Sequence, residues 1–318
     1  MPPSRPLVVA MIALLVLLGV PLLGACGAAG TDRDGAGSTP DDTTRVIHHA
    51  TGDTTITGRP QRVVVLDTGE LDSVLALGVT PVAAVRADAT SGLPSYLAGR
   101  ASDVAVAGTI GEPDLEAIAA LQPDLILSNK VRHEDLYDRL SGIAPTVFAE
   151  KVGVAWQENF RLAAEALGQQ AKAQRILAEY ADKAKRTGQA FGDPAALQVS
   201  MVRFLPGSIR LYGQGSFIGT ILADAGFARP PAQRVDKTFV EVSPEQLGQA
   251  NGDLLFYAAY GSTGKAEQDQ LTAGPLWQRL SAVSGGRAHE VSDDLWYVGI
   301  GPIAADLVLD DLQWYAGT

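Results

Sequence analysis

Residues 113–127 read PDLEAIAALQPDLIL, and residues 242–256 read VSPEQLGQANGDLLF. The two stretches align without a gap and match Glu116 with Glu245, Ile118 with Leu247, Leu121 with Ala250, and Asp124 with Asp253. Each copy predicts a short helix with an acidic first turn, a turn at Pro or Gly, and an apolar strand that follows an aspartate. Because such a unit cannot bury its apolar face alone, two copies predict two similarly built lobes.

Further apolar runs surround the two copies. Strands are expected in the first lobe at 62–66, 81–85, 104–106, 125–127 and 146–148, and in the second at 197–205, 209–212, 254–256 and 288–291. A hairpin over 46–56 precedes them. Helical patterns alternate with these strands, and strands in such an alternation pair in parallel. The predicted fold class is therefore α/β, with a parallel sheet in each lobe.

The region between the lobes predicts a helix. From Trp156 to Gln189 nearly every residue favours the helical state, and apolar residues form one stripe, although Gly168 could divide the segment. A helix of about 30 residues, at 1.5 Å each, could run across both lobes. The expected domains are a first lobe at 46–155, a connecting helix at 156–190 and a second lobe at 191–318.

The N-terminus predicts export. Arg5 is followed by an uncharged apolar run over 6–25, as in a secretory signal peptide, although the run is also long enough for an uncleaved membrane anchor. Residues 23–26 read LGAC and resemble the bacterial lipobox, and Cys26 is the only cysteine in the chain. We therefore expect a signal peptide at 1–25, lipidation of Cys26 and a flexible tether at 26–45.

Composition restricts the partners. The net charge of −11 and the lack of a basic run argue against nucleic acid or an anionic bilayer as the main partner. The four histidines show no metal-ligand spacing, and they are His48, His49, His133 and His289. Gly213–Phe217 lacks the glycine that a nucleophile elbow requires after its serine, and no nucleophile–base pair stands out. We expect neither a metal site nor an enzyme.

Ligands of open parallel sheets bind beyond the carboxyl ends of the strands. This rule selects Asp67, Thr68, Arg86, Asn129, Lys130, residues 257–260 and residues 293–297. Arg203 interrupts the apolar strand 201–205, so its charge must be paired or face a cleft. The set is rich in Arg, Tyr and Trp, which favours a bulky ligand with oxygen acceptors.

Four segments together resemble the siderophore and cobalamin binding proteins of bacterial ABC importers, and they are residues 59–66, 111–127, 239–256 and 296–302. The resemblance covers nearly all of 45–318. It implies two Rossmann-like lobes joined by one long interdomain helix, with a ligand cleft between the lobes. It also implies that Glu116 and Glu245, one on each lobe, dock onto a membrane permease that works with an ATPase.

Within this family the manganese and zinc branch requires histidine ligands, which the sequence does not offer. A ferric siderophore brings its own iron coordination, so no cofactor is expected. Residues 203–213 resemble siderophore-binding members, particularly those for hydroxamates. The resemblance thus implies Arg86 and Arg203 as donors to the chelate, with Arg132 a weaker candidate, and the walls would be Tyr212, Tyr257, Tyr260 and Trp296.

The expected protein is a monomeric, lipid-anchored capture protein on the extracytoplasmic face of the cell membrane, which delivers a ferric siderophore to an ABC permease. One alternative is cobalamin or haem binding by the same fold. Another is an exported enzyme that uses Asp67 with Asp293 or Asp294 as a carboxylate pair. A third is a structural or signalling lipoprotein that uses Glu116 and Glu245 as a contact face.

Overall fold

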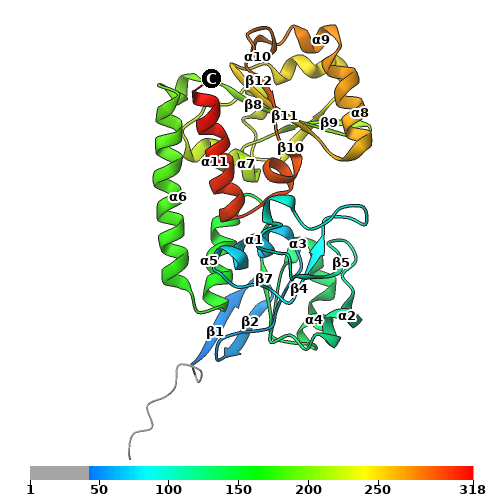
Figure 1. The fold of residues 1–318 in the computed structure, drawn as a ribbon, viewed down its shortest axis with the longest axis vertical. Helices are drawn as coiled ribbons and strands as arrows, with labels where there is room; N and C mark the ends of the chain where they lie inside the picture. Colours follow the sequence, from blue (N-terminus) through cyan, green and yellow to red (C-terminus); the bar gives the residue numbers. More distant parts are fainter. Residues whose placement is uncertain (1–42, 318) are drawn as a thin grey trace, which may run out of the picture. The chain divides into compact units, whose positions relative to one another are not determined.

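The computed structural model describes residues 43–317 (Figure 1). The predicted signal peptide, Cys26 and most of the predicted tether lie outside these residues. No helix in the described part is long and apolar enough to cross a membrane. The described part begins with an antiparallel hairpin of β1 (Thr44–His49) and β2 (Gly52–Thr57).

The first lobe contains a five-stranded, fully parallel sheet in the order β5-β4-β3-β6-β7. Its strands are β3 (Val63–Val65), β4 (Ala83–Arg86), β5 (Ala105–Thr109), β6 (Leu125–Asn129) and β7 (Thr146–Ala149). Its helices are α1 (Thr68–Ala76), α2 (Leu115–Ala120), α3 (Lys130–His133) and α4 (Tyr137–Ser141), with short 3-10 turns η2 (Ser95–Leu97) and η3 (Glu134–Leu136). The β3 side chains are all buried, as expected for a strand covered on both faces.

The second lobe repeats this strand order as β10-β9-β8-β11-β12. Its strands are β8 (Val199–Leu205), β9 (Ser208–Tyr212), β10 (Phe239–Val242), β11 (Leu254–Ala259) and β12 (Ala288–Glu290). Strands β8, β11 and β12 are parallel, whereas β9 and β10 are antiparallel to their neighbours. Only two residues join β8 to β9, and a connection that short can join only antiparallel strands. The prediction of two α/β lobes is confirmed, but the second sheet is mixed rather than wholly parallel, because the short connection after β8 forces β9 to run antiparallel to it.

The helices of the second lobe lie around that sheet. They are α7 (Phe217–Asp224), η5 (Pro231–Gln233), η6 (Pro244–Ala250), α8 (Gly261–Thr272), α9 (Pro275–Gln278), α10 (Ser281–Ser284) and the π-helical turn η7 (Asp294–Val298). The second copy of the repeated unit therefore forms a 3-10 helix where the first forms the α-helix α2. Strand β10 and helix α8 were not predicted from the sequence.

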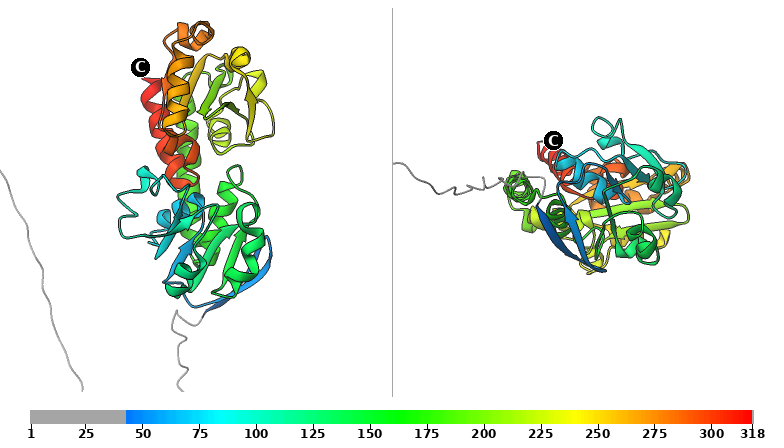
Figure 2. Two further views of the ribbon diagram at one scale, coloured as in Figure 1. Left: turned by 90° about the vertical axis from the view of Figure 1, so that its right-hand side faces the viewer. Right: turned by 90° about the horizontal axis from the view of Figure 1, so that it is seen from below.

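The segment 156–190 forms two helices, α5 (Trp156–Ala166) and α6 (Gln170–Ala190). The break falls at Gly168, whose φ of +68° lies in the left-handed region that favours glycine. Figure 1 and Figure 2 both show α11 (Pro302–Ala316) running alongside α6. The segment 156–190 is therefore divided into two helices at Gly168, and α6 and α11 both run between the lobes.

Both connecting helices are attached to the first lobe by hydrogen bonds. At the start of α6, the Lys172 ammonium donates to the carbonyl of Leu77 at 2.7 Å. At the start of α11, the buried Asp72 carboxylate on α1 accepts the N–H groups of Ile303 and Ala304 at 2.8 and 2.9 Å. Each helix is thus fixed at its N-terminal end and packs against the second lobe further along.

The repeated unit performs the same task in both lobes. Asp124, before β6, accepts the backbone N–H groups of Gln61 and Arg62 at 2.7 and 2.9 Å, just before β3. Asp253, before β11, accepts the N–H of Gln198 at 2.9 Å, just before β8. Each aspartate therefore fixes the start of its own strand relative to the neighbouring central strand.

Candidate functional site

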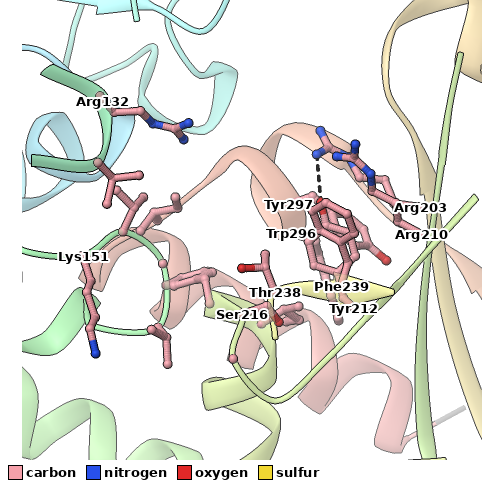
Figure 3. A pocket seen from close by; sticks show the side chains of 18 residues that line it. Arg132, Lys151, Arg203, Arg210, Tyr212, Ser216, Thr238, Phe239, Trp296 and Tyr297 are labelled. Carbon is pink, nitrogen blue, oxygen red and sulfur yellow. Dashed lines mark hydrogen bonds between the residues drawn. The ribbon is translucent and has the colours of Figure 1, made fainter. Parts of the chain in front are cut away.

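A cavity of about 540 Å³ lies between the two lobes (Figure 3). The first lobe contributes residues from α3 and from the loop after β7, and they are Val131, Arg132, Lys151, Val152, Gly153 and Val154. The second lobe contributes Arg203, Arg210, Tyr212, Gly215, Ser216, Phe217, Ile218, Thr238, Phe239, Trp296, Tyr297 and Ile300. The carboxyl ends of β6 and β7 thus face the antiparallel pair of the second sheet.

Arg203 is the most firmly held cation of the cavity. Its guanidinium donates to both carboxylate oxygens of Asp293, at 2.6 and 2.7 Å, and to the Tyr212 hydroxyl at 3.1 Å. It also lies 4.9 Å from the centre of the Tyr260 ring. A bidentate pair of this kind fixes the guanidinium in orientation as well as in position.

Aromatic rings form most of the second-lobe wall. Tyr212 and Tyr297 meet edge to face with ring centres 4.8 Å apart, and the Tyr297 hydroxyl donates to the carbonyl of Val202 at 2.9 Å. Trp296 is fully buried beside the cavity, and its indole N–H donates to Asp311 at 2.8 Å. These contacts hold the rings in place without a ligand, so the wall is rigid.

Arg210 completes this wall from β9. Its guanidinium lies 4.0 Å from the centre of the Phe239 ring and pairs with Glu241 at 3.0 Å. Figure 3 shows Arg203 and Arg210 grouped with the aromatic rings, and Arg132 and Lys151 on the opposite side of the cavity.

On the first-lobe side, Arg132 is held from behind by buried acids. Its Nε donates to Asp67 at 3.2 Å, and the Asn129 amide donates to Asp67 at 3.1 Å and to Glu70 at 3.4 Å. Asp67 and Glu70 are buried, and burial together with the nearby Asp67 charge raises the pKa of Glu70 to about 8. Glu70 therefore carries a proton at neutral pH and serves as a neutral partner of Asn129.

Lys151 is the remaining cation. It follows β7 and is exposed, and its ammonium has no ion-pair partner in the part of the chain that the structure describes. The residues that line the cavity thus include four cations and no carboxylate, in a chain of net charge −11. Three of the four cations are paired with acids that lie outside the lining.

The structure brings together only some of the residues selected from the sequence. Arg203, Tyr212, Trp296 and the weaker candidate Arg132 line the cavity, whereas Arg86, Tyr257 and Tyr260 do not. Tyr257 is half-buried and packs against the second-lobe core, with its ring centre 4.9 Å from that of Trp277. The Nε of Arg86 is buried and has no hydrogen-bond partner among the described residues.

Tyr260 lies at another edge of the cleft, where the lobes contact directly. Its hydroxyl donates to Asp88 of the first lobe, and Asp294 of the second lobe accepts the hydroxyl of Ser95 at 2.6 Å. A separate cavity of about 300 Å³ lies here and is lined by Asp88, Tyr260 and Asp294 among others. One edge of the cleft is therefore held together by hydrogen bonds, and the other contains the large cavity.

Glu116 lies in the first turn of α2, and Glu245 lies in the first turn of η6. Each glutamate thus stands at the helical end of its repeated unit, away from the carboxyl end of the strand that follows. Both side chains are exposed. Hydrogen bonding to Ser243 lowers the pKa of Glu245, so it is ionised at neutral pH. Each lobe thus presents a glutamate at the same place in the repeated unit.

Several lining residues were missed by the sequence analysis. Lys151 could have been found by the same rule that selected Asn129, because it follows a parallel strand. Arg210 and Phe239 could not, because they belong to antiparallel strands whose direction the rule does not cover. In the described part of the chain, no group of three His, Cys, Asp or Glu residues could hold a metal ion.

Comparison with known proteins gives consistent results. Residues 63–294 match the family described as periplasmic binding protein. A probable siderophore-binding lipoprotein of Bacillus subtilis, YfiY, is 37% identical over 311 residues, which cover 94% of this chain and 95% of the relative. The Fe(3+)-citrate-binding protein YfmC of the same organism is 32% identical, over 89% of each chain. The crystal structure of Staphylococcus aureus SirA complexed with staphyloferrin B superposes with a TM-score of 0.79 at 31% identity, over 86% of this chain and 99% of SirA.

Proposed function

The chain belongs to the periplasmic binding protein family, and from that premise we propose that it captures a ferric siderophore and delivers it to the permease of an ABC importer. The observation that carries this proposal is the cavity between the lobes, with four lining cations, no lining carboxylate and an aromatic wall. A cavity of this charge in an acidic protein suits a bulky chelate with anionic oxygens. The relative YfiY is a probable siderophore-binding lipoprotein and YfmC is an Fe(3+)-citrate-binding protein, which supports the same ligand class for this chain.

The roles of the residues follow from this geometry. The paired guanidiniums of Arg203 and Arg210 and the guanidinium of Arg132 would donate to chelate oxygens. Tyr212, Tyr297 and Phe239 would contact the apolar parts of the chelate. The iron is cargo that the siderophore already coordinates, so the protein needs only shape and hydrogen-bond donors. We propose no catalytic role, since the family consists of binding proteins.

The subclass of siderophore is a finer proposal. Hydroxamate binding, which residues 203–213 predict, stays a prediction. The four lining cations favour a chelate with net negative charge, which ferric citrate complexes have. A hydroxamate siderophore that also carries free carboxylates would satisfy both expectations.

Delivery would involve the exposed glutamates and the lipid anchor. Glu116 and Glu245 stand one on each lobe, so a permease could contact both at once. Acylation of Cys26 would hold the protein on the extracytoplasmic face of the membrane. We infer a monomer, because one chain supplies both walls of the cavity.

The direct test of capture is a tryptophan fluorescence titration, since Trp296 lies beside the cavity. The titrants are ferric citrate, a ferric hydroxamate, a ferric catecholate, cobalamin and haem, each with its metal-free counterpart where one exists. We expect saturable quenching at sub-micromolar concentration by at least one ferric chelate and not by its iron-free form. Binding of cobalamin or haem alone, or of none of the five, would overturn the proposal.

Delivery is tested separately. The double variant Glu116→Ala/Glu245→Ala should bind the chelate as wild type does but should lose iron uptake in cells. The matched control is Glu158→Ala/Glu179→Ala, which removes two exposed glutamates outside the repeated unit. Normal uptake by the first variant, or equal loss in the control, would show that the permease does not use these two residues.

A further inference from the structure

Arg229, between α7 and η5, is a buried arginine without an acidic partner in the described part of the chain. It is 3% exposed, and its guanidinium donates to the carbonyls of Val199 and Tyr212 at 2.8 and 2.7 Å and to the amide oxygen of Gln233 at 2.5 Å. Its second terminal nitrogen, Nη1, is buried and has no hydrogen-bond partner among the described residues. All three acceptors are neutral, so the positive charge is not compensated locally.

Such an arrangement has a cost that the fold does not remove. A buried charge is normally paired, because the loss of hydration is expensive unless an opposite charge replaces it. Burial lowers the pKa of Arg229 only to about 10, so the guanidinium stays charged at neutral pH. A methionine would fill a similar volume without burying a charge, so the charge of Arg229 itself requires an explanation.

The position of Arg229 supplies that role. Its guanidinium contacts the backbone of Tyr212, and the side chain of Tyr212 lines the cavity. The two arginines that line the cavity on this lobe, Arg203 and Arg210, are paired with Asp293 and Glu241. Arg229 therefore lies behind the aromatic wall as a buried positive charge that has no acidic partner among the described residues. Charges interact strongly across a buried, poorly hydrated region.

We propose that Arg229 determines ligand charge specificity without touching the ligand: its uncompensated charge behind Tyr212 favours ferric chelates with net negative charge over neutral ones. This inference rests on the proposed capture of a ferric chelate and adds the charge class of the substrate. Arg229 also connects β8, β9 and η5 through its three hydrogen bonds, so a purely structural role is the competing explanation. A structural role would affect neutral and anionic chelates alike.

Gln233 offers a way to cancel the charge without removing the arginine. Its amide oxygen accepts from Arg229, and its amide nitrogen donates to the Ser200 hydroxyl at 2.7 Å. In Gln233→Glu, a carboxylate of the same shape would pair with Arg229, and the Ser200 hydroxyl could donate to it instead. The packing stays the same, and the local charge falls by one unit.

The experiment measures the affinities of the full-length protein for ferric citrate, which is anionic, and for ferrichrome, a neutral ferric chelate. We expect Gln233→Glu to weaken ferric citrate binding about tenfold per unit of ligand charge and to change ferrichrome binding less than about twofold. Arg229→Gln should act in the same direction, and Arg229→Lys should restore the preference. If the wild type does not bind ferrichrome measurably, the loss of ferric citrate affinity in Gln233→Glu must recur in Arg229→Gln and be absent in Arg229→Lys, which keeps the charge.

The other outcomes are distinguishable. Equal loss for both chelates, or an unchanged ferric citrate affinity in a folded Gln233→Glu protein, would show that the charge of Arg229 has no part in selection. A wild type that binds only ferrichrome would overturn the inference and leave capture intact. A wild type that binds no ferric chelate would overturn the proposed function itself. Thermal unfolding of Gln233→Glu, expected at or above the wild-type Tm, separates these results from misfolding.

Discussion

The two walls of the cavity are built differently. On the second-lobe wall, Arg203 is held by Asp293 and Tyr212, and the Tyr212 ring in turn meets Tyr297 edge to face. On the first-lobe wall, Arg132 is half exposed and tied to Asp67 by one contact, and Lys151 is unpaired in the described part of the chain. The second lobe thus offers a preformed surface, whereas the first offers charges that can still adjust to a ligand. Rigid and adaptable donors are divided between the lobes.

Loss of Arg203 should have the largest effect on ligand affinity and on the stability of the second-lobe wall. In Arg203→Ala the ligand loses a fixed donor, and the partly buried Asp293 carboxylate is left without its guanidinium partner. We expect affinity to fall about 100-fold and the free energy of unfolding to fall by about 3 kcal/mol. Titration and chemical denaturation measure the two effects.

A second variant separates the two losses. Arg203→Met/Asp293→Leu removes both charges, so stability should recover while affinity stays low. If the double variant recovered affinity as well, Arg203 would matter only for the fold of the wall.

On the first-lobe wall, Arg132→Ala should lower affinity about tenfold. Stability should change by less than about 1 kcal/mol, because the partly exposed side chain makes one screened contact and Asp67 keeps its bond from Asn129. The matched control is Arg139→Ala, an exposed arginine on α4 outside the cavity. A large loss of stability in Arg132→Ala would mean that the two walls are equally rigid.

Glu70, one of the buried acids behind Arg132, predicts that the contribution of the first-lobe wall to stability depends on pH. Because the folded pKa of Glu70 is raised to about 8, its contribution to stability is full below about pH 4.5 and is lost as pH rises through about 8. Glu70→Gln keeps the acceptor for Asn129 and cannot ionise. We expect the variant to be more stable than wild type at pH 8.5, by on the order of 1 kcal/mol, and closely similar at pH 4.5. Parallel pH profiles of the two Tm values would contradict the assignment.

Lys151 should give the smallest effect. Lys151→Ala is expected to lower affinity about threefold at low salt and less at 0.5 M salt, because exposed charges are screened. Lys185→Ala, on the exposed face of α6, is the control. An effect of Lys151→Ala that does not depend on salt would indicate direct hydrogen bonding rather than general attraction.

The sequence predicted the lobes well because their signals are local. In each copy of the repeated unit, the apolar run predicts a strand and the aspartate precedes it. In the structure Asp124 and Asp253 each accept a backbone N–H just before the neighbouring central strand. Arg203 was found because a charge inside an apolar strand needs an explanation. Its guanidinium contacts both carboxylate oxygens of Asp293, which accounts for the charge in that strand.

The rest of the site depends on information that the sequence does not carry locally. The carboxyl-end rule finds where a strand ends but not which face a side chain occupies, and Tyr257 packs against the core of its own lobe rather than lining the cavity. The antiparallel pair that brings Arg210 and Phe239 to the cavity was not foreseen. Arg229 lies between elements, and only the structure reveals that it is buried with neutral acceptors and without an acidic partner among the described residues.

The double connection between the lobes has a mechanical consequence. A single connecting helix would allow one lobe to rotate relative to the other about the helix axis at little cost. Here α6 and α11 run side by side and are both fixed to the first lobe, through Lys172 and Asp72. Rotation about either axis would shear one helix past the other, whereas a small rocking motion bends both together. The pair of helices therefore resists rotation of one lobe about the helix axes and still permits a small rocking of the lobes through bending of both helices.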